Sequence, residues 1–338
     1  MALSFDKSYE NGGLNSNREE LLDLTTVLSP RQAPVYGLLS KQKVSADLVE
    51  WTVDNLRDPS DVAVIEGTDV DFSAAGSTDA EQFSSLARLD NRVEHFRDQF
   101  LVSKKQEVYD SVTPVKVQQA EEKATSQLLR DIEKSICGDQ GAVAGSGAAA
   151  GKSRGLGKWI SNAAQSDGAS DVPAAFRTPL ASIKSDASTL TESEFAGILG
   201  SIFNEVGEMQ DLHLVADTAL RNHIVDEFTR ADSTGTSVRY NVEGSEAVVE
   251  YNVELFRGPF GIVKIITANP KCMPESVAGA HDRGYILDPN LLAWGEALSM
   301  GSTMLEDRGA GPRGYIDCMG TLICKGSNGL GKITDITA

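Results

Sequence analysis

The chain has 338 residues, with 49 acidic and 31 basic side chains and a formal net charge of −18. Hydrophobic residues make up 41% of the sequence, which is enough for a folded core and argues against disorder throughout. The longest basic cluster is Lys104–Lys105, which argues against a broad nucleic-acid-binding surface, because such a surface needs many cations. The first twenty residues contain no apolar segment, and no stretch approaches the roughly 18 apolar residues of a membrane-spanning helix. We therefore expect an acidic, soluble, intracellular protein.

The first third of the chain is polar and poor in regular structure. Residues 1–44 are rich in turn-forming residues, which predicts an extended arm rather than a packed element. Residues 45–110 contain two β-like pieces, at 62–65 and 93–102, on either side of a polar segment of small residues. Such a long hairpin cannot bury much of itself, and an isolated two-stranded hairpin is marginally stable in water. We expect this hairpin to lie on another surface.

The strongest helix signal covers residues 115–136. Thr113 can cap its N-terminus, Pro114 suits the first helical position, and Gly138 ends the pattern. The apolar residues at helical spacing are Val117, Ala120, Ala124, Leu128, Ile132 and Ile136. This pattern predicts a rod of about 33 Å with one narrow apolar stripe and a charged back.

A second helix is predicted at 192–206. Thr191 and Glu194 have the spacing of a capping box, and Leu190 and Phe195 occupy the two positions of a hydrophobic staple. This helix start is specified entirely by neighbouring residues. The start of this helix is therefore well specified.

Strands dominate the last third of the chain. The segment DLHLVA (211–216) predicts a buried strand, after which Asp217 can cap a third helix carrying Leu220, Ile224 and Phe228. Residues 236–268 predict antiparallel strands, and 316–324 alternate again near the end. Because helices and antiparallel strands mix without a βαβ rhythm, the predicted fold class is α+β.

The glycine-rich segment 138–155 contains six glycines and five alanines and predicts a flexible loop. Within it, Gly151-Lys152-Ser153 invites comparison with a phosphate-binding P-loop. That motif needs a glycine where Ser146 stands, and it must follow a strand, whereas this loop follows a helix. The flexible-loop interpretation is therefore favoured over a nucleotide site.

Cysteines and acidic residues give no metal site. The four cysteines are typical of a reduced compartment, and Cys318 and Cys324 would be about 20 Å apart in one strand, too far for one ion. Asp69, Asp71 and Ser73 resemble the opening of a calcium loop, but an alanine replaces the glycine that the loop requires.

Histidines and nucleophiles also form no recognisable array. The histidines are His95, His213, His223 and His281. His213 lies in an apolar strand and is predicted to be a hydrogen-bonded core residue, while His223 has no acidic partner at ligand spacing. No G-x-S-x-G nucleophile elbow is present. We predict no catalytic, cofactor-binding or metal-binding residues.

Eight segments, taken in chain order, carry a resemblance to a known family. They read DLTTVLSPRQAPVYGLLS, LVEWTVDNLRDP, VAVIEGTDV, ARLDNRVEHFRDQFLVSKKQEVYD, SRGLGKWISNA, FRGPFGIVKIITANPKCMP, YILDPNLLAWGEAL and GYIDCMGTLICKG. With the long helix, their order and spacing resemble the major capsid proteins of tailed bacteriophages, which have the Hong Kong 97 capsid fold. The chain departs from that pattern at Lys105–Gln106, where a threonine-like residue is expected before the glutamine, and in 138–188, which are longer and richer in glycine.

The resemblance implies five regions. Residues 1–44 would form the N-terminal arm, and 45–110 the extended hairpin loop that lies across a neighbouring subunit. Residues 111–190 would form the peripheral domain with its spine helix, and 191–285 the axial domain, which meets its copies around fivefold and sixfold axes. Residues 286–338 would supply strands that return to the peripheral domain.

The resemblance also implies a function. It is that of a structural head protein whose copies assemble as hexamers and pentamers into an icosahedral shell around double-stranded DNA, without sequence-specific binding. Such a protein is part of the virion and is made in the host cytoplasm, with portal, scaffold or decoration proteins as candidate partners and no membrane. An acidic inner surface would not bind the packaged DNA tightly.

Two alternatives stay open at this point. An encapsulin-like nanocompartment shell resembles the same fold but encloses an enzyme cargo, and a neighbouring portal or terminase gene would distinguish the two. A nucleotide-dependent enzyme built on the glycine-rich loop at 145–153 belongs to a different class, and nucleotide turnover by a Lys152→Ala variant would decide it.

Overall fold

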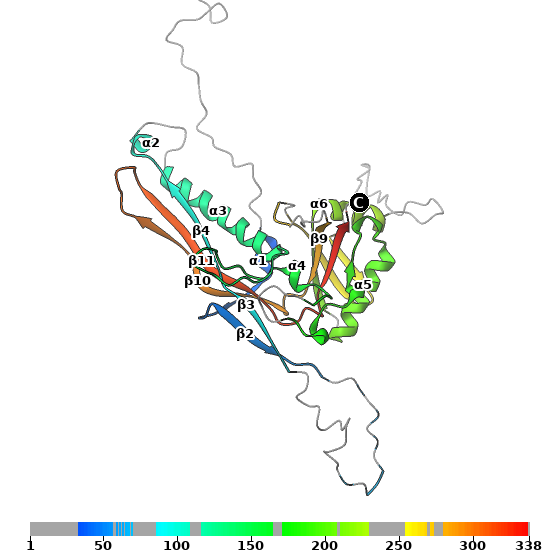
Figure 1. Ribbon diagram of the computed structural model, residues 1–338. Coiled ribbons are helices and arrows are strands. Elements are labelled where there is room, and N and C mark those ends of the chain that lie inside the picture. Colours follow the sequence, from blue (N-terminus) through cyan, green and yellow to red (C-terminus); the bar gives the residue numbers. More distant parts are fainter. Residues whose placement is uncertain are drawn as a thin grey trace, which may run out of the picture.

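The computed structural model describes most of the chain. The described residues are 33–56, 59, 61, 63, 65–67, 69, 86–108, 116–164, 171–207, 210–229, 254–268, 271–273 and 280–336. They form two packed units and a projecting hairpin (Figure 1). Helices and mainly antiparallel strands are mixed, which confirms the predicted α+β class.

The first unit is a sheet covered by the long helix. Its strand order is β1 (Ser40–Lys43), β10 (Leu292–Leu305), β11 (Arg313–Cys324) and β4 (Glu94–Leu101). β1 is parallel to β10, and the other neighbours are antiparallel. The helix α3 (Lys116–Cys137) lies along the sheet, and the two share one hydrophobic core (Figure 1). The short helix α2 (Lys104–Val108) stands at the far end.

The apolar stripe of α3 explains this packing. Ala124, Leu128, Ile132 and Ile136 are buried, and Val117 and Ala120 pack partly buried against the same core. Burying such a face stabilises a helix far more than intrinsic propensity does. The prediction of a helix at 115–136 is therefore confirmed to within a residue at each end, whereas the cap predicted at Thr113 and Pro114 lies outside the described residues.

The second unit contains the other sheet. Its strand order is β5 (Ile183–Lys184), β12 (Gly331–Ile336), β9 (Ala280–Leu287), β6 (Gln210–Ala216), β8 (Gly261–Thr267) and β7 (Leu255–Gly258). Two helices, α5 (Glu192–Val206) and α6 (Thr218–Thr229), flank it (Figure 1). Short 3-10 turns at Ala174–Phe176, Leu180–Ser182 and Ala187–Thr189 and the one-turn helix α4 (Leu156–Trp159) connect the two units.

Local signals placed α5 and α6 correctly. The Thr191 side chain accepts from the backbone N–H of Glu194, and the Glu194 carboxylate accepts from the backbone N–H of Thr191, which confirms the predicted capping box. Leu190 and Phe195 are both fully buried, as the staple requires. Asp217 accepts from the Leu220 N–H at 2.7 Å and caps α6. The described part of 236–268 forms the predicted antiparallel pair β7–β8, and residues 236–253 lie outside the described residues.

Two strands belong to sheets other than those expected. Residues 286–338 were expected to return to the first unit; β10 and β11 lie in its sheet, but β12 pairs with β9 and β5 in the second. Similarly, β4 was predicted as a hairpin strand and instead pairs with β11. The reason is physical: alternation reveals that a strand has one buried face, but it carries no information about which strand lies beside it.

A hairpin does occur within 45–110, with different strands from those predicted. It is made by β2 (Leu48–Val53) and β3 (Ala87–Arg92), which pair from Leu48–Arg92 to Val53–Ala87. Ile65 is outside any strand, and Val62 and Val64 lie outside the described residues. The predicted strand at 93–102 exists as β4.

Residues 33–39 pack against the first unit and the exposed residues 40–43 pair with its sheet, which corrects the prediction of an extended arm throughout 1–44. The helix α1 (Pro34–Leu38) buries Val35 completely, and β1 extends the first sheet. The buried Glu133 carboxylate in α3 accepts from the Val35 N–H at 2.9 Å and from the Tyr36 N–H at 2.8 Å. These donors are the open backbone groups at the start of α1, so Glu133 supplies the cap that the sequence around α1 lacks. Residues 1–32 lie outside the described residues.

Glu133 predicts a measurable pH effect. Burial raises its pKa above the ordinary 4.5, and the two backbone N–H donors oppose this only in part. A carboxyl group with a raised folded-state pKa binds its proton more tightly in the folded state, so stability decreases as pH rises from 4.5 through the raised pKa. The Glu133→Gln variant has no ionisable group at this position, so it lacks this pH-dependent loss of stability. We therefore expect the variant to become more stable, relative to the wild-type subunit, as the pH rises across that window. Denaturant titrations at several pH values measure the two unfolding free energies. A difference that is independent of pH would contradict this.

The glycine-rich segment is also more ordered than predicted. Val143 and Lys152 form an antiparallel bridge with both backbone hydrogen bonds at 3.0 Å, and Ser153 and Arg154 are buried. A Cβ on Gly155 would collide with the carbonyl of Gly138, so glycine is needed where these backbones meet. Residues 143–150 and Lys152 are exposed.

Candidate assembly surfaces

The base of the β2–β3 hairpin is fixed by a buried asparagine. Asn91, in β3, is fully buried and donates from Nδ2 to the carbonyl of Leu322 at 2.7 Å and to Ser153 Oγ at 3.1 Å. Its Oδ1 accepts from the Arg154 N–H at 2.8 Å. Because these partners lie in β11 and in the ordered end of the glycine-rich segment, one side chain joins three parts of the chain.

Tryptophans hold the other strand of the hairpin. The indole N–H of Trp51, in β2, donates to the carbonyl of Cys324 at 3.0 Å, and its ring lies 5.8 Å from that of Trp159. The buried Arg154 guanidinium lies over the Trp159 ring at 4.6 Å. The hairpin therefore leaves the first unit in a defined direction.

Beyond this base, the hairpin carries apolar side chains that nothing in the described part of the chain covers. Leu56 is 91% exposed, Ile65 84% and Leu86 56%. Among the described residues, β2 and β3 also pair only with each other, which leaves one backbone edge of each strand open. Open strand edges beside exposed apolar groups are typical of surfaces that bind another chain.

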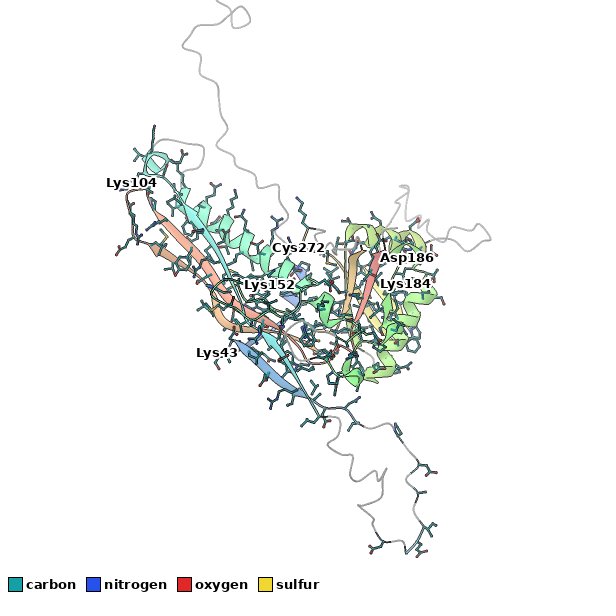
Figure 2. The ribbon with its side chains drawn as sticks, viewed as in Figure 1. Lys43, Lys104, Lys152, Lys184, Asp186 and Cys272 are labelled. Atoms are coloured by element: carbon teal, nitrogen blue, oxygen red, sulfur yellow. The ribbon has the colours of Figure 1, made fainter. Side chains whose placement is uncertain are left out.

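A second exposed apolar group lies at the far end of the first sheet. It consists of Leu101, Val108, Met304 and Leu305, from β4, α2 and β10. Arg313 pairs with both Leu101 and Leu305, so the ends of these strands lie side by side. Lys104 marks this end in Figure 2, far from the second unit.

The loop at this far end is held by one carboxylate. Asp307 forms an ion pair with Lys104 at 2.6 Å and accepts from the N–H groups of Gly309 at 2.7 Å and Gly311 at 3.1 Å. The contact with Lys104, followed by the two backbone donors, lowers the pKa of Asp307 to about 2. The exposed apolar group at the far end of the first sheet therefore lies beside an ordered turn.

Ser153, in the segment that resembles a P-loop, makes hydrogen bonds that hold the fold together. The Ser153 hydroxyl binds Asn91 and also accepts from the Leu322 N–H at 3.3 Å. The backbone N–H of Ser153 donates to the Glu94 carboxylate at 3.2 Å, where a phosphate-binding loop would point its amides at the ligand. This geometry favours the structural interpretation of Gly151-Lys152-Ser153.

The cysteines behave as buried apolar residues. Cys318 and Cys324 lie in one strand, β11, as predicted, and burial is the main factor that raises the pKa of each thiol to about 12. Within the described ranges, no three His, Cys, Asp or Glu side chains are grouped as metal ligands. Asp71 and Ser73 of the calcium-like segment lie outside those ranges.

The histidines have separate environments. The prediction for His213 is partly wrong: it is half-buried in β6, but its buried Nδ1 has no hydrogen-bond partner among the described residues. Burial lowers the pKa of His213. His223 Nε2 lies 2.9 Å from the carbonyl of Leu190, and His95 Nε2 lies 3.4 Å from Asp317 Oδ2. The side chain of His281 is not described.

Solved structures with a similar fold include phage capsids and an encapsulin. The chain is similar to the capsid of a native GTA particle, with 14% identity, coverage of 99% of this chain and 100% of that one, and a TM-score of 0.60. It is similar to the capsid of cyanophage P-SCSP1u, with 10% identity, coverage of 99% and 100%, and a TM-score of 0.59. It also resembles the SrpI encapsulin of Synechococcus elongatus, with 10% identity, coverage of 94% and 91%, and a TM-score of 0.52.

These likenesses define the class: the fold is that of phage capsid proteins of Hong Kong 97 type. A comparison with curated protein sequences gave no match. The family model described as SU10 major capsid protein matches residues 7–337, so the chain belongs to the SU10 major capsid protein family. It is a structural subunit of the phage head and forms part of an oligomeric shell in the virion. No helix in the described ranges is long and apolar enough to span a bilayer.

Proposed function

We propose that copies of this chain form the hexamers and pentamers of an icosahedral head, with the β2–β3 hairpin of each copy lying across a neighbour. The observation that carries this proposal is the exposed apolar hairpin on a rigid base. Covering its side chains with a second copy removes apolar area from water at roughly 25 cal/mol per Å². Repeated contacts of this kind close into rings when the rotation between copies permits.

The units of the subunit have separate roles in this proposal. The second unit, with much of 191–285, faces the ring centres, and the first unit, with α3, contacts adjacent rings through its exposed far end. Residues 1–32 act as an arm between copies. The subunit has no catalytic role, is made in the host cytoplasm, and encloses double-stranded DNA that its net charge of −18 does not bind tightly. Portal, scaffold or decoration proteins would add to these contacts.

Electron microscopy of the protein expressed alone tests the proposal. We expect closed shells built from hexamers and pentamers, because the contacts reside in this chain. Sedimentation at high protein concentration provides the complementary measurement. A compact monomer at all concentrations would contradict the proposal.

A nanocompartment shell is a second candidate, favoured by the similarity to the SrpI encapsulin. Two observations separate the candidates. A portal or terminase gene beside this one, with shells that contain DNA, supports a phage head. Shells that consistently contain one co-purified enzyme support a nanocompartment.

A further inference from the structure

The two units are joined directly by a four-residue turn. Residues 288–291, called the joint below, connect β9 of the second unit to β10 of the first. Asp288 builds this turn: its Oδ1 accepts from the Asn290 N–H at 2.9 Å, and its carbonyl accepts from the Leu291 N–H at 3.1 Å. The Leu291 carbonyl accepts from the N–H of Lys325, beside the end of β11, at 2.8 Å. The conformation of the joint therefore influences how the second unit is held against the first.

The second unit meets the first along one face of its sheet. Val215, Tyr285 and Leu287, from β6 and β9, belong to the same hydrophobic core as α3. The Tyr285 hydroxyl donates to the carbonyl of Cys137, at the C-terminal end of α3, at 2.7 Å. His213 pairs with Leu287 in the register of β6 and β9 and lies two residues before Val215, so its side chain is on this face. His213 therefore lies at the boundary between the two units.

Two buried polar atoms at this boundary have no hydrogen-bond partner among the described residues. They are Nδ1 of His213 and Oδ2 of Asp288, and Asp288 is only 1% exposed. Asp288 directly follows Leu287, the strand partner of His213, and the two side chains are close enough to interact electrostatically. A buried carboxylate oxygen without a donor costs free energy. A protonated His213 would supply the donor that Asp288 lacks.

The charges around His213 keep its ring neutral in this arrangement. The charged groups that face it are Asp211 on its own strand, Lys264 on β8 and Asp288 after β9. Burial, and then Lys264, lower the pKa of His213 from 6.5, while Asp211 and Asp288 act in the opposite direction. The described arrangement thus binds a proton less tightly than a freely hydrated histidine does. As the pH falls below 6.5, the proton favours an arrangement that pairs the charged ring better.

We propose that His213 and Asp288 form a pH-dependent switch at the joint between the two units. With His213 neutral, the joint keeps the described arrangement. When solvent supplies a proton, the charged ring donates from Nδ1 to Oδ2 of Asp288, the turn 288–291 shifts to meet it, and the second unit rotates relative to the first. The switch lies within one chain, so it operates whether or not shells assemble. In a shell, the same rotation would alter the contacts of every copy.

The distance between two spin labels tests the proposal. Lys123→Cys on α3 and Asn222→Cys on α6 place one label at an exposed position of each unit, and the four native cysteines are buried. A small fraction of labelled subunits is mixed with unlabelled protein, so that only distances within one chain are measured. We expect a second distance population to appear as the pH falls from about 8 to about 5, with a one-proton midpoint below 6.5.

Two variants assign this transition to its residues. His213→Gln cannot be charged, so the second population should be lost completely. Asp288→Asn keeps an acceptor for the Asn290 N–H but has no negative charge, so the midpoint should fall by about one pH unit. The matched control is His95→Gln, which makes the same substitution at a histidine beside Asp317 in the first sheet. This control should titrate like the wild-type chain.

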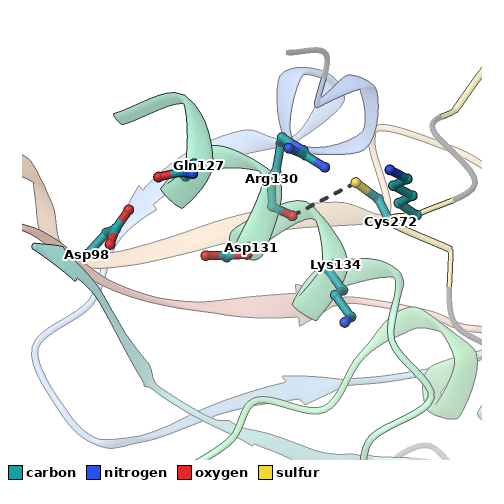
Figure 3. A pocket seen from close by; sticks show the side chains of 7 residues that line it. Asp98, Gln127, Arg130, Asp131, Lys134 and Cys272 are labelled. Atoms are coloured by element: carbon teal, nitrogen blue, oxygen red, sulfur yellow. Dashed lines mark hydrogen bonds between the residues drawn. The ribbon is translucent and has the colours of Figure 1, made fainter. Parts of the chain in front are cut away.

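A second control covers carboxyl groups of the first unit that have raised pKa values. Asp131 lines a polar pocket of about 420 Å³ between α3, β4 and the segment 271–273 (Figure 3). Burial, and then the neighbouring Asp98, raise the pKa of Asp131. Asp131→Asn should leave the transition unchanged, because Asp131 and Asp98 both belong to the first unit. Glu133→Gln provides the same comparison for the buried carboxyl group that caps α1.

Each other result overturns the inference. A label distance that is independent of pH shows that there is no switch, and a transition that persists in His213→Gln or disappears in Asp131→Asn assigns it to another group. An unchanged midpoint in Asp288→Asn shows that Asp288 does not receive the proton of His213. If His213→Gln disturbs folding, as circular dichroism would reveal, the midpoint of Asp288→Asn decides. Labelled subunits that respond to pH but form no shells would contradict the proposed assembly alone.

Discussion

Deletion of residues 70–80 is expected to yield a folded subunit that forms no shells. The base of the hairpin is held by Asn91 and Trp51, whose partners all lie outside the deleted segment. The hydrophobic cores of both units also contain none of these residues. Circular dichroism and thermal unfolding should therefore remain close to those of the wild-type subunit, because the deleted residues contribute nothing to the described packing.

Assembly should fail because the part of the hairpin that reaches a neighbour is shortened by eleven residues. Sedimentation and electron microscopy measure this directly. Replacement of Ala74 and Ala75 by serine serves as the control, because it preserves the length and charge of the segment, and shells are expected. Normal shells from the deletion variant would remove the hairpin from the assembly contacts.

Leu128→Pro is expected to have the largest effect on stability. Leu128 lies near the middle of α3 and is 1% exposed. Proline removes a helical hydrogen bond and collides with the preceding turn, at a cost of about 3 kcal/mol or more. The substitution also empties space in the core that α3 shares with the first sheet. We expect little soluble subunit and no assembled particles.

A graded series separates loss of the helix from loss of packing. Leu128→Ala retains the helix but leaves a cavity, so denaturant titration should show a loss of about 2–5 kcal/mol. Glu122→Ala changes an exposed position on the same helix and should alter stability by no more than about 0.5 kcal/mol. Wild-type yields of shells from Leu128→Pro would show that α3 is not a structural support of the subunit.

Several elements followed from the sequence because their signals are local. The start of α5 depends on Thr191 and Glu194, three residues apart, and the start of α6 depends on Asp217 beside it. The stripe of α3 repeats every three or four residues, so its buried face could be identified before its partner was known. Likewise, a hairpin within 45–110 was predicted, together with its need for a second surface.

The candidate surfaces were predicted less completely. The sequence indicated an acidic tip on a projecting hairpin, but it gave no signal for the buried contacts of Asn91, whose partners are 62 to 231 residues away. No local signal indicated that Glu133 is buried and bound to α1, 97 and 98 residues away.

The sequence by itself therefore determined the three longer helices α3, α5 and α6, the fold class and the absence of a recognisable catalytic motif, because these signals come from residues a few positions apart. The tertiary structure alone decided which strands are neighbours, placing β4 in the first sheet and β12 in the second. It also brought α1 against Glu133. These contacts depend on where distant segments meet, and that position is set by the packing of both cores together, which no local pattern encodes.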